Sequence, residues 1–235
     1  LYKNKFEDSP AKRKEKSKSS QLYVPRFDDE QNSSFVVDSW YKKSFWLYLL
    51  YPFSLIVSYI TAKRRRKYLK GASETHKSEV PVIVVGNLTI GGTGKTPLVK
   101  YIASELLSLG YKPGLVSRGY GGKFKETLLV SDQTPVKQTG DEAQILATLN
   151  LPFYIDKSRV RAVKAITDNH DCDIIISDDG LQHYKMNRDI EIVVIDGKRR
   201  FGNNLTFPAG PLRESKARLN SVDFIVNNSG PTDEG

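Results

Sequence analysis

Six consecutive residues of this chain have the types that hold nucleotide phosphates: Gly91, Gly92, Thr93, Gly94, Lys95 and Thr96. In a loop of this kind successive backbone N–H groups point inward, the lysine reaches the β- and γ-phosphates, and the threonine hydroxyl ligates Mg²⁺. The strict motif has a glycine five residues before Gly94, where this chain has Thr89, so the match is to a variant. The alternative is an ordinary glycine-rich loop. We favour the phosphate-binding interpretation, in which the chain uses ATP or GTP.

The segments on either side of this loop support the phosphate-binding interpretation. The apolar run from Val82 to Gly86 predicts a buried strand. After the loop, apolar residues recur at helical spacing, at Leu98, Ile102, Leu106 and Leu109. Pro97 falls in the first turn of that helix, where a missing N–H costs little. We expect a strand, the loop and an amphipathic helix in succession, with the Lys95 side chain exposed.

The rest of the chain alternates between apolar runs and helical patterns. Helices are expected at residues 141–149 and 158–169, and buried strands at residues 113–117, 152–155, 173–180, 190–196 and 222–226. Continuous apolar strands separated by helices predict a mostly parallel sheet covered on both faces. We therefore predict an α/β fold of the P-loop NTPase type, with ligands at the carboxyl ends of the strands.

Two adjacent carboxylates, Asp178 and Asp179, directly follow one of these predicted strands. In P-loop enzymes an aspartate at a strand end holds the Mg²⁺ that neutralises charge on the transferring phosphoryl group. The sequence Asp-Asp-Gly is also a good turn, so a plain loop cap is the alternative. Because the pair ends a predicted strand in a chain with a phosphate loop, we favour the metal site.

Four further polar clusters are less informative by themselves. Arg118 lies in a flexible, cationic loop that suits an anionic substrate or is a simple turn. Asp141 opens a predicted helix, and local sequence favours a helix N-cap. His183 can titrate near neutral pH, although most histidines are surface or structural residues. Residues 207–214 form a stiff loop that ends in Arg213 and Glu214.

Composition and charge narrow the class of protein. With 235 residues and 39% hydrophobic content, the chain can bury one sizeable α/β core. Residues 1–79 contain 17 Lys and Arg against 9 Asp and Glu, whereas residues 80–235 contain 19 against 18. Because the basic excess lies outside the predicted core, no nucleic-acid partner is expected. The single cysteine, Cys172, excludes an internal disulfide framework and fits a reducing compartment.

The N-terminal part divides into two segments of different character. Residues 1–38 are polar and charged without periodicity, so we expect a disordered or adventitious basic tail. Residues 39–71 are expected to form a membrane-associated helix, because the uncharged, aromatic-rich run from Phe45 to Ile60 precedes the basic residues 63–67. The run is shorter than a spanning helix and is interrupted by Pro52, so peripheral or monotopic association is favoured. A helix packed on the core is the alternative.

Five motifs in this chain closely resemble, in order, those of the tetraacyldisaccharide 4′-kinases of lipid A biosynthesis. They are Asn87 to Pro97, Ser117 to Tyr120, Gly140 to Glu142, Asp178 to His183 and Pro208 to Glu214. The resemblance runs from about Trp46 to the end and identifies residues 72–235 as the kinase domain. It implies transfer of a phosphoryl group from ATP to the 4′-hydroxyl of a lipid A disaccharide precursor, at the cytoplasmic face of the inner membrane.

The resemblance also assigns roles to residues. Lys95 and the loop amides bind the phosphates, while Thr96 and the Asp178–Asp179 pair hold Mg²⁺. Asp141 becomes the candidate base for the sugar hydroxyl, which overturns the local preference for an N-cap. Arg118 is expected to contact substrate phosphate. Four further residues are expected to line or support the site: Gln182, His183, Arg213 and Glu214.

Members of the family are usually about a hundred residues longer at the C-terminus, where a second lobe closes over the cleft and supplies a histidine that partners the aspartate. On this resemblance that lobe is expected to be missing from the present chain. A rival interpretation is a membrane-tethered nucleotide switch similar to the partitioning ATPases, which dimerise with nucleotide. Those proteins usually carry a second lysine early in the loop, and residues 87–93 contain none.

Overall fold

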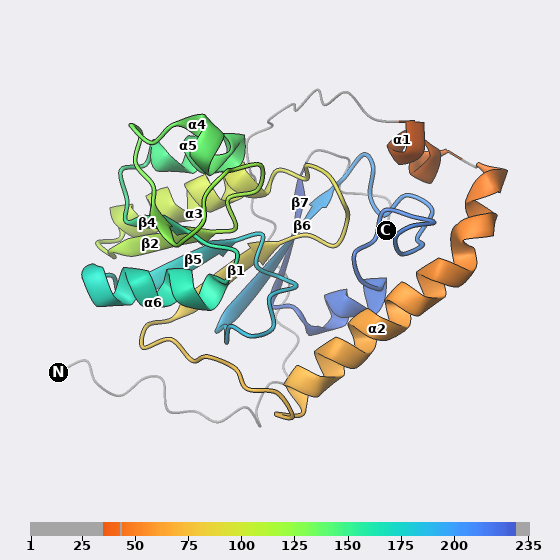
Figure 1. Ribbon diagram of the computed structural model, residues 1–235, viewed down its shortest axis with the longest axis horizontal. Coiled ribbons are helices and arrows are strands. Elements are labelled where there is room, and N and C mark those ends of the chain that lie inside the picture. The colour runs from red at the N-terminus through yellow and green to blue at the C-terminus, as the bar shows by residue number, and fades with distance from the viewer. Residues whose placement is uncertain (1–34, 43, 229–235) are drawn as a thin grey trace.

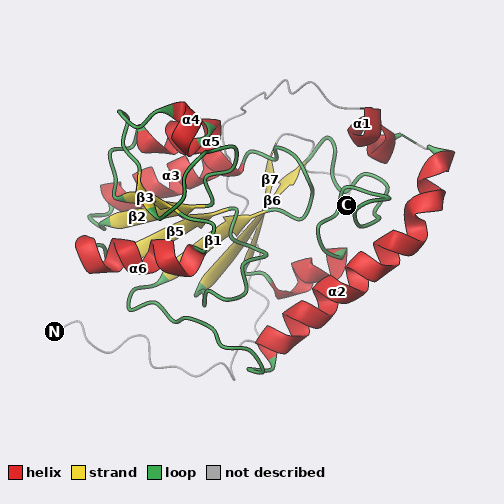
Figure 2. Ribbon diagram, viewed as in Figure 1, coloured by secondary structure: helices red, strands yellow, loops and turns green. Residues whose placement is uncertain are grey.

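The computed structural model describes residues 35–42 and 44–228, and the described residues form one seven-stranded sheet (Figures 1 and 2). Its order is β3-β4-β2-β5-β1-β6-β7, and every neighbouring pair is parallel except β3 and β4. The strands are β1 (Val82–Gly86), β2 (Pro113–Ser117), β3 (Leu128–Leu129), β4 (Phe153–Ile155), β5 (Ile174–Asp178), β6 (Ile190–Asp196) and β7 (Phe224–Asn228). The predicted mostly parallel α/β fold is confirmed.

Helices cover both faces of the sheet, as predicted. On one face lie α3 (Lys95–Ser108) and α5 (Asp141–Ala147), and on the other lies α6 (Arg159–Asn169) (Figure 1). Strand β1 is buried on both sides, because Ile83 and Val85 pack in the core beneath α3 while Val82 and Val84 pack in the core beneath α6. This two-sided burial explains why β1 is a continuous apolar run.

Some elements differ from the sequence-based expectation. Leu109 was expected on the buried face of α3, but it is the C-cap residue and is exposed, because the helix ends one residue earlier. Strand β7 was expected to be buried, yet Phe224 and Ile225 are exposed because β7 is the last strand of the described sheet. Three short elements carry no strong pattern and were not predicted: β3, α4 (Val136–Thr139) and η3 (Lys216–Ser221).

The expectation of a disordered tail over residues 1–38 is wrong for its last four residues. Phe35–Tyr41 form helix α1, and residues 1–34 lie outside the described part of the chain. The helix is held by Trp40, whose buried indole donates a hydrogen bond to the carbonyl of Pro208 and meets the Phe207 ring edge-on. A contact across 168 residues is invisible to local composition, which explains the error.

The apolar run forms η2 (Phe45–Leu50) and α2 (Tyr51–Leu69), and α2 lies along one side of the core (Figure 1). Pro52 does not break α2, because it stands in the first turn, where no helical hydrogen bond is lost. A polar seam attaches α2 to the core: the hydroxyl of Ser54 donates to the carbonyl of Thr206 at 2.7 Å, and that of Ser58 lies 2.9 Å from the Thr206 hydroxyl. At the other end, Tyr68 stacks on Tyr184.

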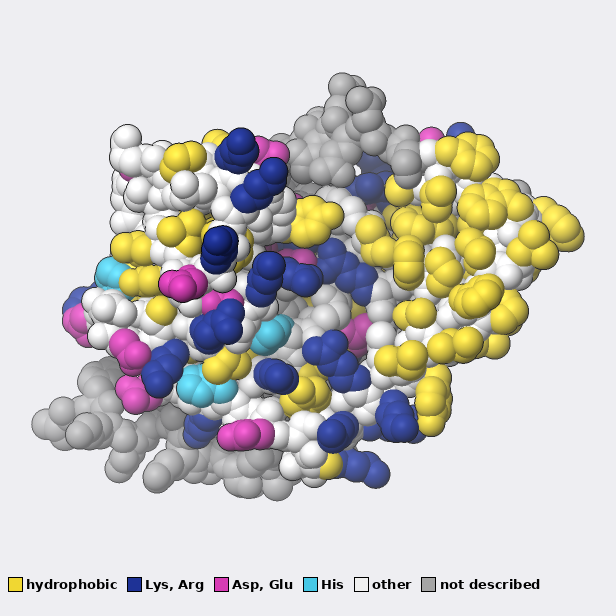
Figure 3. Space-filling model, in the orientation of Figure 1, with side chains coloured by type: hydrophobic (Ala, Val, Ile, Leu, Met, Phe, Trp, Pro, Cys, Tyr) yellow, Lys and Arg dark blue, Asp and Glu magenta, His cyan; other side chains and the backbone are white. Residues whose placement is uncertain are grey.

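The outer side of η2 and α2 carries large exposed apolar side chains, which gather over one end of the molecule (Figure 3). We call this set the apolar face; it consists of Phe45, Tyr48, Leu49, Phe53, Leu55, Ile56, Tyr59 and Ile60. Among the described residues, only the 25-residue segment Phe45–Leu69 is long and apolar enough to cross a membrane, by length and composition alone.

Candidate functional site

The predicted phosphate loop connects β1 to α3 at the carboxyl edge of the sheet. Gly94 has φ +81°, and a Cβ atom there would lie 2.1 Å from Nδ2 of Asn228, so this position requires glycine. The Asn228 amide donates to the carbonyl of Thr93 at 3.1 Å, which ties the loop to β7. Lys95 and Thr96 form the first turn of α3, so the loop ends at a helix N-terminus, as phosphate binding requires.

Lys95 was expected to be exposed, but its side chain is buried at 6% exposure. The reason is tertiary: Asp179 lies over the loop, with Oδ1 3.7 Å from Nζ of Lys95. In the sheet register Val85 of β1 pairs with Asp178, the last residue of β5, so the acidic pair at the end of β5 adjoins the start of the loop. The structure therefore brings the lysine and the acidic pair together.

Arg213 belongs to the same cluster. Its backbone N–H donates to the carbonyl of Leu88 at 2.6 Å, which fixes the 207–214 loop against the phosphate loop. Its Nη1 donates to both carboxylate oxygens of Asp179, at 2.9 and 3.0 Å. Burial by itself raises the pKa of Asp179, but Lys95 and Arg213 hold that pKa below its ordinary value.

The neighbouring carboxylate, Asp178, has the opposite environment. Its side chain is 1% exposed, and neither carboxylate oxygen has a hydrogen-bond partner within the described residues. Burial raises its pKa to about 6 despite the nearby Lys95, and the negative charges of Asp179 and Glu142 act in the same direction as burial. An ionised carboxylate without partners is costly, which indicates a group that binds a cation.

The residues at this site suit a magnesium ion better than a metal that is coordinated by protein side chains alone. No cluster of three or more His, Cys, Asp or Glu side chains suited to a metal occurs in the part of the chain that is described. Mg²⁺ typically takes one or two carboxylates and completes its coordination with water and substrate phosphates. The partnerless oxygens of Asp178 beside the hydroxyl-bearing first turn of α3 meet that requirement.

Arg159 is a site residue that sequence analysis missed. Its guanidinium is fully buried and donates to the backbone carbonyls of Asp178 at 2.9 Å and Asp179 at 3.2 Å. Burial lowers its pKa to about 10, so it stays charged at neutral pH. It therefore orients the acidic turn from beneath. The sequence carried no signal for this role, because an arginine at the start of a predicted helix is ordinarily solvated.

Two loops meet on the other side of the site. Gly140 has φ +82°, and a Cβ atom there would lie 2.0 Å from the carbonyl oxygen of Tyr120, so the loop containing Arg118 packs on the start of α5. Asp141 is not the N-cap that local sequence favours; Gly140 is, and Asp141 is the exposed first residue of α5. Arg118 is also exposed, and its charge contributes to the lowered pKa of Arg159.

The remaining predicted residues differ in their surroundings. Gln182 donates to the carbonyl of Asn87 at 3.1 Å, at the base of the phosphate loop. Burial, followed by the charges of Arg159 and Arg188, lowers the pKa of His183 to about 4, so its ring is neutral at neutral pH. Glu214 is buried and accepts a hydrogen bond from the Tyr184 hydroxyl at 2.5 Å, which is consistent with a supporting role.

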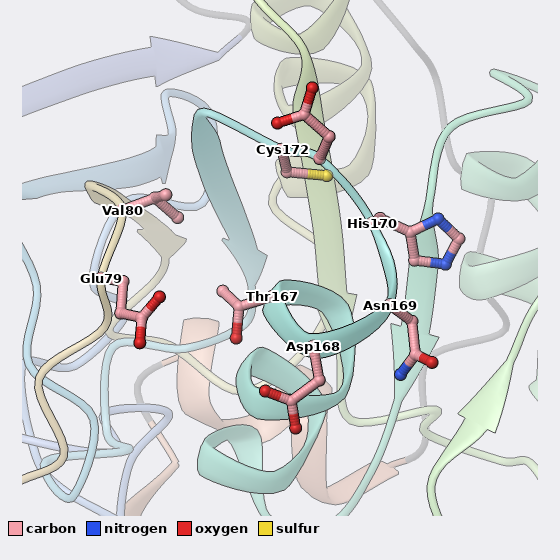
Figure 4. A pocket seen from close by; sticks show the side chains of 8 residues that line it. Glu79, Val80, Thr167, Asp168, Asn169, His170 and Cys172 are labelled. Carbon is pink, nitrogen blue, oxygen red and sulfur yellow. The ribbon is translucent and has the colours of Figure 1, made fainter.

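A cavity of about 440 Å³ lies elsewhere, between Glu79 and the segment from Thr167 to Cys172 (Figure 4). That segment precedes β5, so the cavity is at the amino-terminal edge of the sheet and apart from the phosphate loop. Its side chains include Glu79, Asp168 and Asp171 but none of the predicted site residues.

Comparison with known proteins identifies the family. The family model described as tetraacyldisaccharide-1-P 4′-kinase, LpxK, matches residues 46–235. The chain belongs to the tetraacyldisaccharide 4′-kinase family. The match covers all five motifs on which the resemblance was based, and it includes the apolar face apart from Phe45.

Individual members of the LpxK family are similar over the same region. A tetraacyldisaccharide 4′-kinase of Psychromonas ingrahamii is 51% identical over 193 residues, and one of Vibrio campbellii is 49% identical over 189 residues. These matches cover 81% and 80% of this chain but 60% and 56% of the relatives, so the chain spans less than two thirds of their length.

A crystal structure of LpxK from Aquifex aeolicus, described as an "apo" form in complex with ATP, is similar with a TM-score of 0.72 and 33% identity. The match covers 78% of this chain and 59% of that one.

Proposed function

We propose that this chain transfers the γ-phosphoryl group of ATP to the 4′-hydroxyl of a lipid A tetraacyldisaccharide precursor. One observation carries the proposal: in a chain of this family, a phosphate loop with its lysine adjoins a buried carboxylate, Asp178, whose oxygens have no partners in the described residues. ATP is the nucleotide that the related Aquifex structure contains. The acceptor follows from the names of the relatives.

The loop residues hold the phosphates. The N–H groups of residues 91–96 would hold the phosphate oxygens, and Lys95, which contacts Asp179 in this structure, would bind the β- and γ-phosphates. Asp179 and Arg213 keep the lysine in position before the nucleotide binds, because the three side chains form one ion-pair cluster. Gly92 and Gly94 allow the close backbone approach that this requires.

Thr96 and Asp178 would hold Mg²⁺, with Asp179 as a neighbouring negative charge rather than a direct ligand. The ion, when bound, neutralises charge on the transferring phosphoryl group. Arg159 fixes the backbone of both aspartates and prevents the acidic turn from relaxing toward solvent. This division differs from the expectation that both carboxylates ligate the metal, since the Asp179 oxygens are already bound to Arg213.

The acceptor hydroxyl would be oriented and deprotonated by Asp141. Its side chain is exposed at the beginning of α5, on the side of the site where the loop of Arg118 also lies. An aspartate at that place can accept the proton that the hydroxyl loses as the new phosphate ester forms. Arg118 is a cation available to a substrate phosphate.

The apolar face would rest in the cytoplasmic leaflet of the bacterial inner membrane. Contacts at Ser54, Ser58 and Tyr68 attach α2 to the core over most of its length, so a helix lying in the surface fits better than one crossing the bilayer. Arg64 at the basic end of α2 contributes to the lowered pKa of His183, so the membrane-facing helix lies close to the site.

The test is incubation with labelled ATP, Mg²⁺ and a lipid A disaccharide precursor in detergent. A kinase labels the lipid, whereas the rival nucleotide switch releases phosphate only. The Lys95→Ala variant is the control for a contaminating kinase, because it should lose the lipid label. Phosphate release without lipid labelling in the unmodified chain would contradict the proposed function.

A further inference from the structure

Arg199 reaches the phosphate loop from the side opposite to the acidic pair. Strands β5 and β6 flank β1, and the turn after β6 therefore adjoins the loop that follows β1. From that turn, Nη2 of Arg199 donates a hydrogen bond to the carbonyl of Gly92. Its Nη1 lies 3.7 Å from the place that a Cβ atom of Gly91 would occupy. The guanidinium thus lies against the glycine half of the loop.

Asp196 holds this arginine in place. As the last residue of β6, Asp196 accepts hydrogen bonds at Oδ1 from the backbone N–H groups of Lys198 and Arg199, both at 3.0 Å. Its Oδ2 accepts from Nε of Arg199 at 2.7 Å. One carboxylate therefore fixes both the turn and the direction of the guanidinium. Because the side chain is positioned in advance, little rotamer entropy remains to be lost when it binds a further group.

Some N–H groups of the Arg199 guanidinium are available to a ligand. Arginine carries five N–H donors, and the acceptors recorded for Arg199 among the described residues are Asp196 and Gly92. The other N–H groups have no protein acceptor in that part of the chain, and the side chain is 40% exposed. Donors of this kind, beside a loop that binds phosphates, match the oxygens of an anionic ligand.

We propose that Arg199 contacts the terminal phosphate of the bound nucleotide and stabilises the charge that develops there. The inference rests on the proposed function. In the transfer, the bond between the γ-phosphorus and the β–γ bridging oxygen breaks and leaves its electron pair on ADP, while the acceptor oxygen bonds to phosphorus. Negative charge spreads over the transferring group, and an arginine supplied within the same chain stabilises it. Lys95 and Arg199 would act from opposite sides of the loop.

The proposal predicts discrimination between tri- and diphosphate, which calorimetric titration measures without turnover. With Mg²⁺ and a non-hydrolysable ATP analogue, Arg199→Ala should weaken binding by about tenfold, or about 1.4 kcal/mol, whereas the affinity for ADP should change by less than about twofold. Arg199→Lys should recover only part of the loss, because an ammonium lacks the forked geometry. The matched control is Lys198→Ala, which removes the same charge from the neighbouring exposed residue and should leave both affinities unchanged.

Other results separate the alternatives. Equal weakening of both nucleotides by Arg199→Ala, or no weakening of either, would overturn the proposal and leave Arg199 as a support of the loop. Circular dichroism checks that each variant is folded; if Arg199→Ala is not, the comparison of analogue with ADP in Arg199→Lys decides. An unmodified chain that binds neither nucleotide would overturn the proposed function as well. Binding that Lys95→Ala abolishes but both Arg199 variants leave intact would overturn only the role of Arg199.

Discussion

The carboxylate of Asp179 receives two hydrogen bonds from Nη1 of Arg213, at 2.9 and 3.0 Å. Asp178, the preceding residue, has no partner for either carboxylate oxygen within the described residues. Asp178 ends β5 and Asp179 follows it, yet the two carboxylates differ: that of Asp179 is paired with cations of this chain, whereas that of Asp178 has no partner among the described residues. This contrast gives the two aspartates separable roles that substitution can test.

Substitution of the two aspartates by asparagine should change stability in opposite directions. Asp178→Asn removes a buried charge without partners, so the metal-free chain should melt at a higher temperature at pH 7. Asp179→Asn leaves Lys95 and Arg213 without their counter-ion, so that variant should melt lower. Differential scanning calorimetry in EDTA measures both. A lower melting temperature for Asp178→Asn would contradict the assignment of a partnerless carboxylate.

The effect of Asp178 should depend on pH in a defined window. Its pKa is about 6 in the folded chain and 3.8 ordinarily, so between these values the folded state binds more protons than the unfolded state. Stability therefore falls as pH rises through that window and then levels off. The stability advantage of Asp178→Asn over the unmodified chain should accordingly grow from pH 4 to pH 6, as urea titrations at each pH will measure. An advantage that does not vary with pH would contradict the raised pKa.

Lys95→Ala should abolish lipid phosphorylation while the fold is retained. In the proposed mechanism the lysine stabilises charge on the phosphates, and Arg213 remains to neutralise Asp179 when the lysine is removed. The measurement is kcat/KM with labelled ATP, beside a circular dichroism spectrum. Lys100→Ala on the exposed side of the same helix is the matched control and should retain activity. More than about a tenth of the activity remaining in Lys95→Ala would contradict the phosphate role.

Asp141→Asn should separate chemistry from nucleotide binding. The proposed base acts on the acceptor hydroxyl, so kcat should fall by about 10²-fold or more while the affinity for ATP is nearly unchanged. Glu142→Gln is a useful comparison at the neighbouring position. The charge of Glu142 raises the pKa of Asp178, so its loss should change the dependence of activity on Mg²⁺ concentration. A parallel loss of ATP binding and turnover in Asp141→Asn would show that Asp141 is structural or a metal ligand.

Replacing Arg64, Arg65 and Arg66 with Gln should weaken binding to anionic vesicles, with the larger effect at low salt. Flotation with phosphatidylglycerol and with neutral phosphatidylcholine vesicles measures the difference. A control variant in which Lys100, Lys123 and Lys125 are changed to Gln removes the same charge from the surface of the α/β domain. It should bind vesicles as the unmodified chain does. Equal binding of the unmodified chain to both vesicle types would show that the basic cluster does not sense the membrane.

Local sequence patterns were sufficient to predict several elements of this fold. The apolar run Val82 to Gly86, the glycines of the loop and the apolar strand before Asp178 predicted β1, the phosphate loop and β5 at nearly their observed bounds. These signals are strong because parallel strands buried on both faces must be continuously apolar, and because Gly94 adopts a backbone conformation that side chains disfavour.

The pairing of the site residues depends on the tertiary fold and could not be predicted from local patterns. Arg159, Arg199 and Asn228 reach the site from α6, the turn after β6 and β7, and each contact depends on the strand order, which local patterns do not specify. The same holds for burial of Lys95 beneath Asp179, for the helix around Trp40, and for the different surroundings of the Asp178 and Asp179 carboxylates. Charge and exposure are set by neighbours distant in sequence, so residue type and spacing predict the chemistry but not the partners.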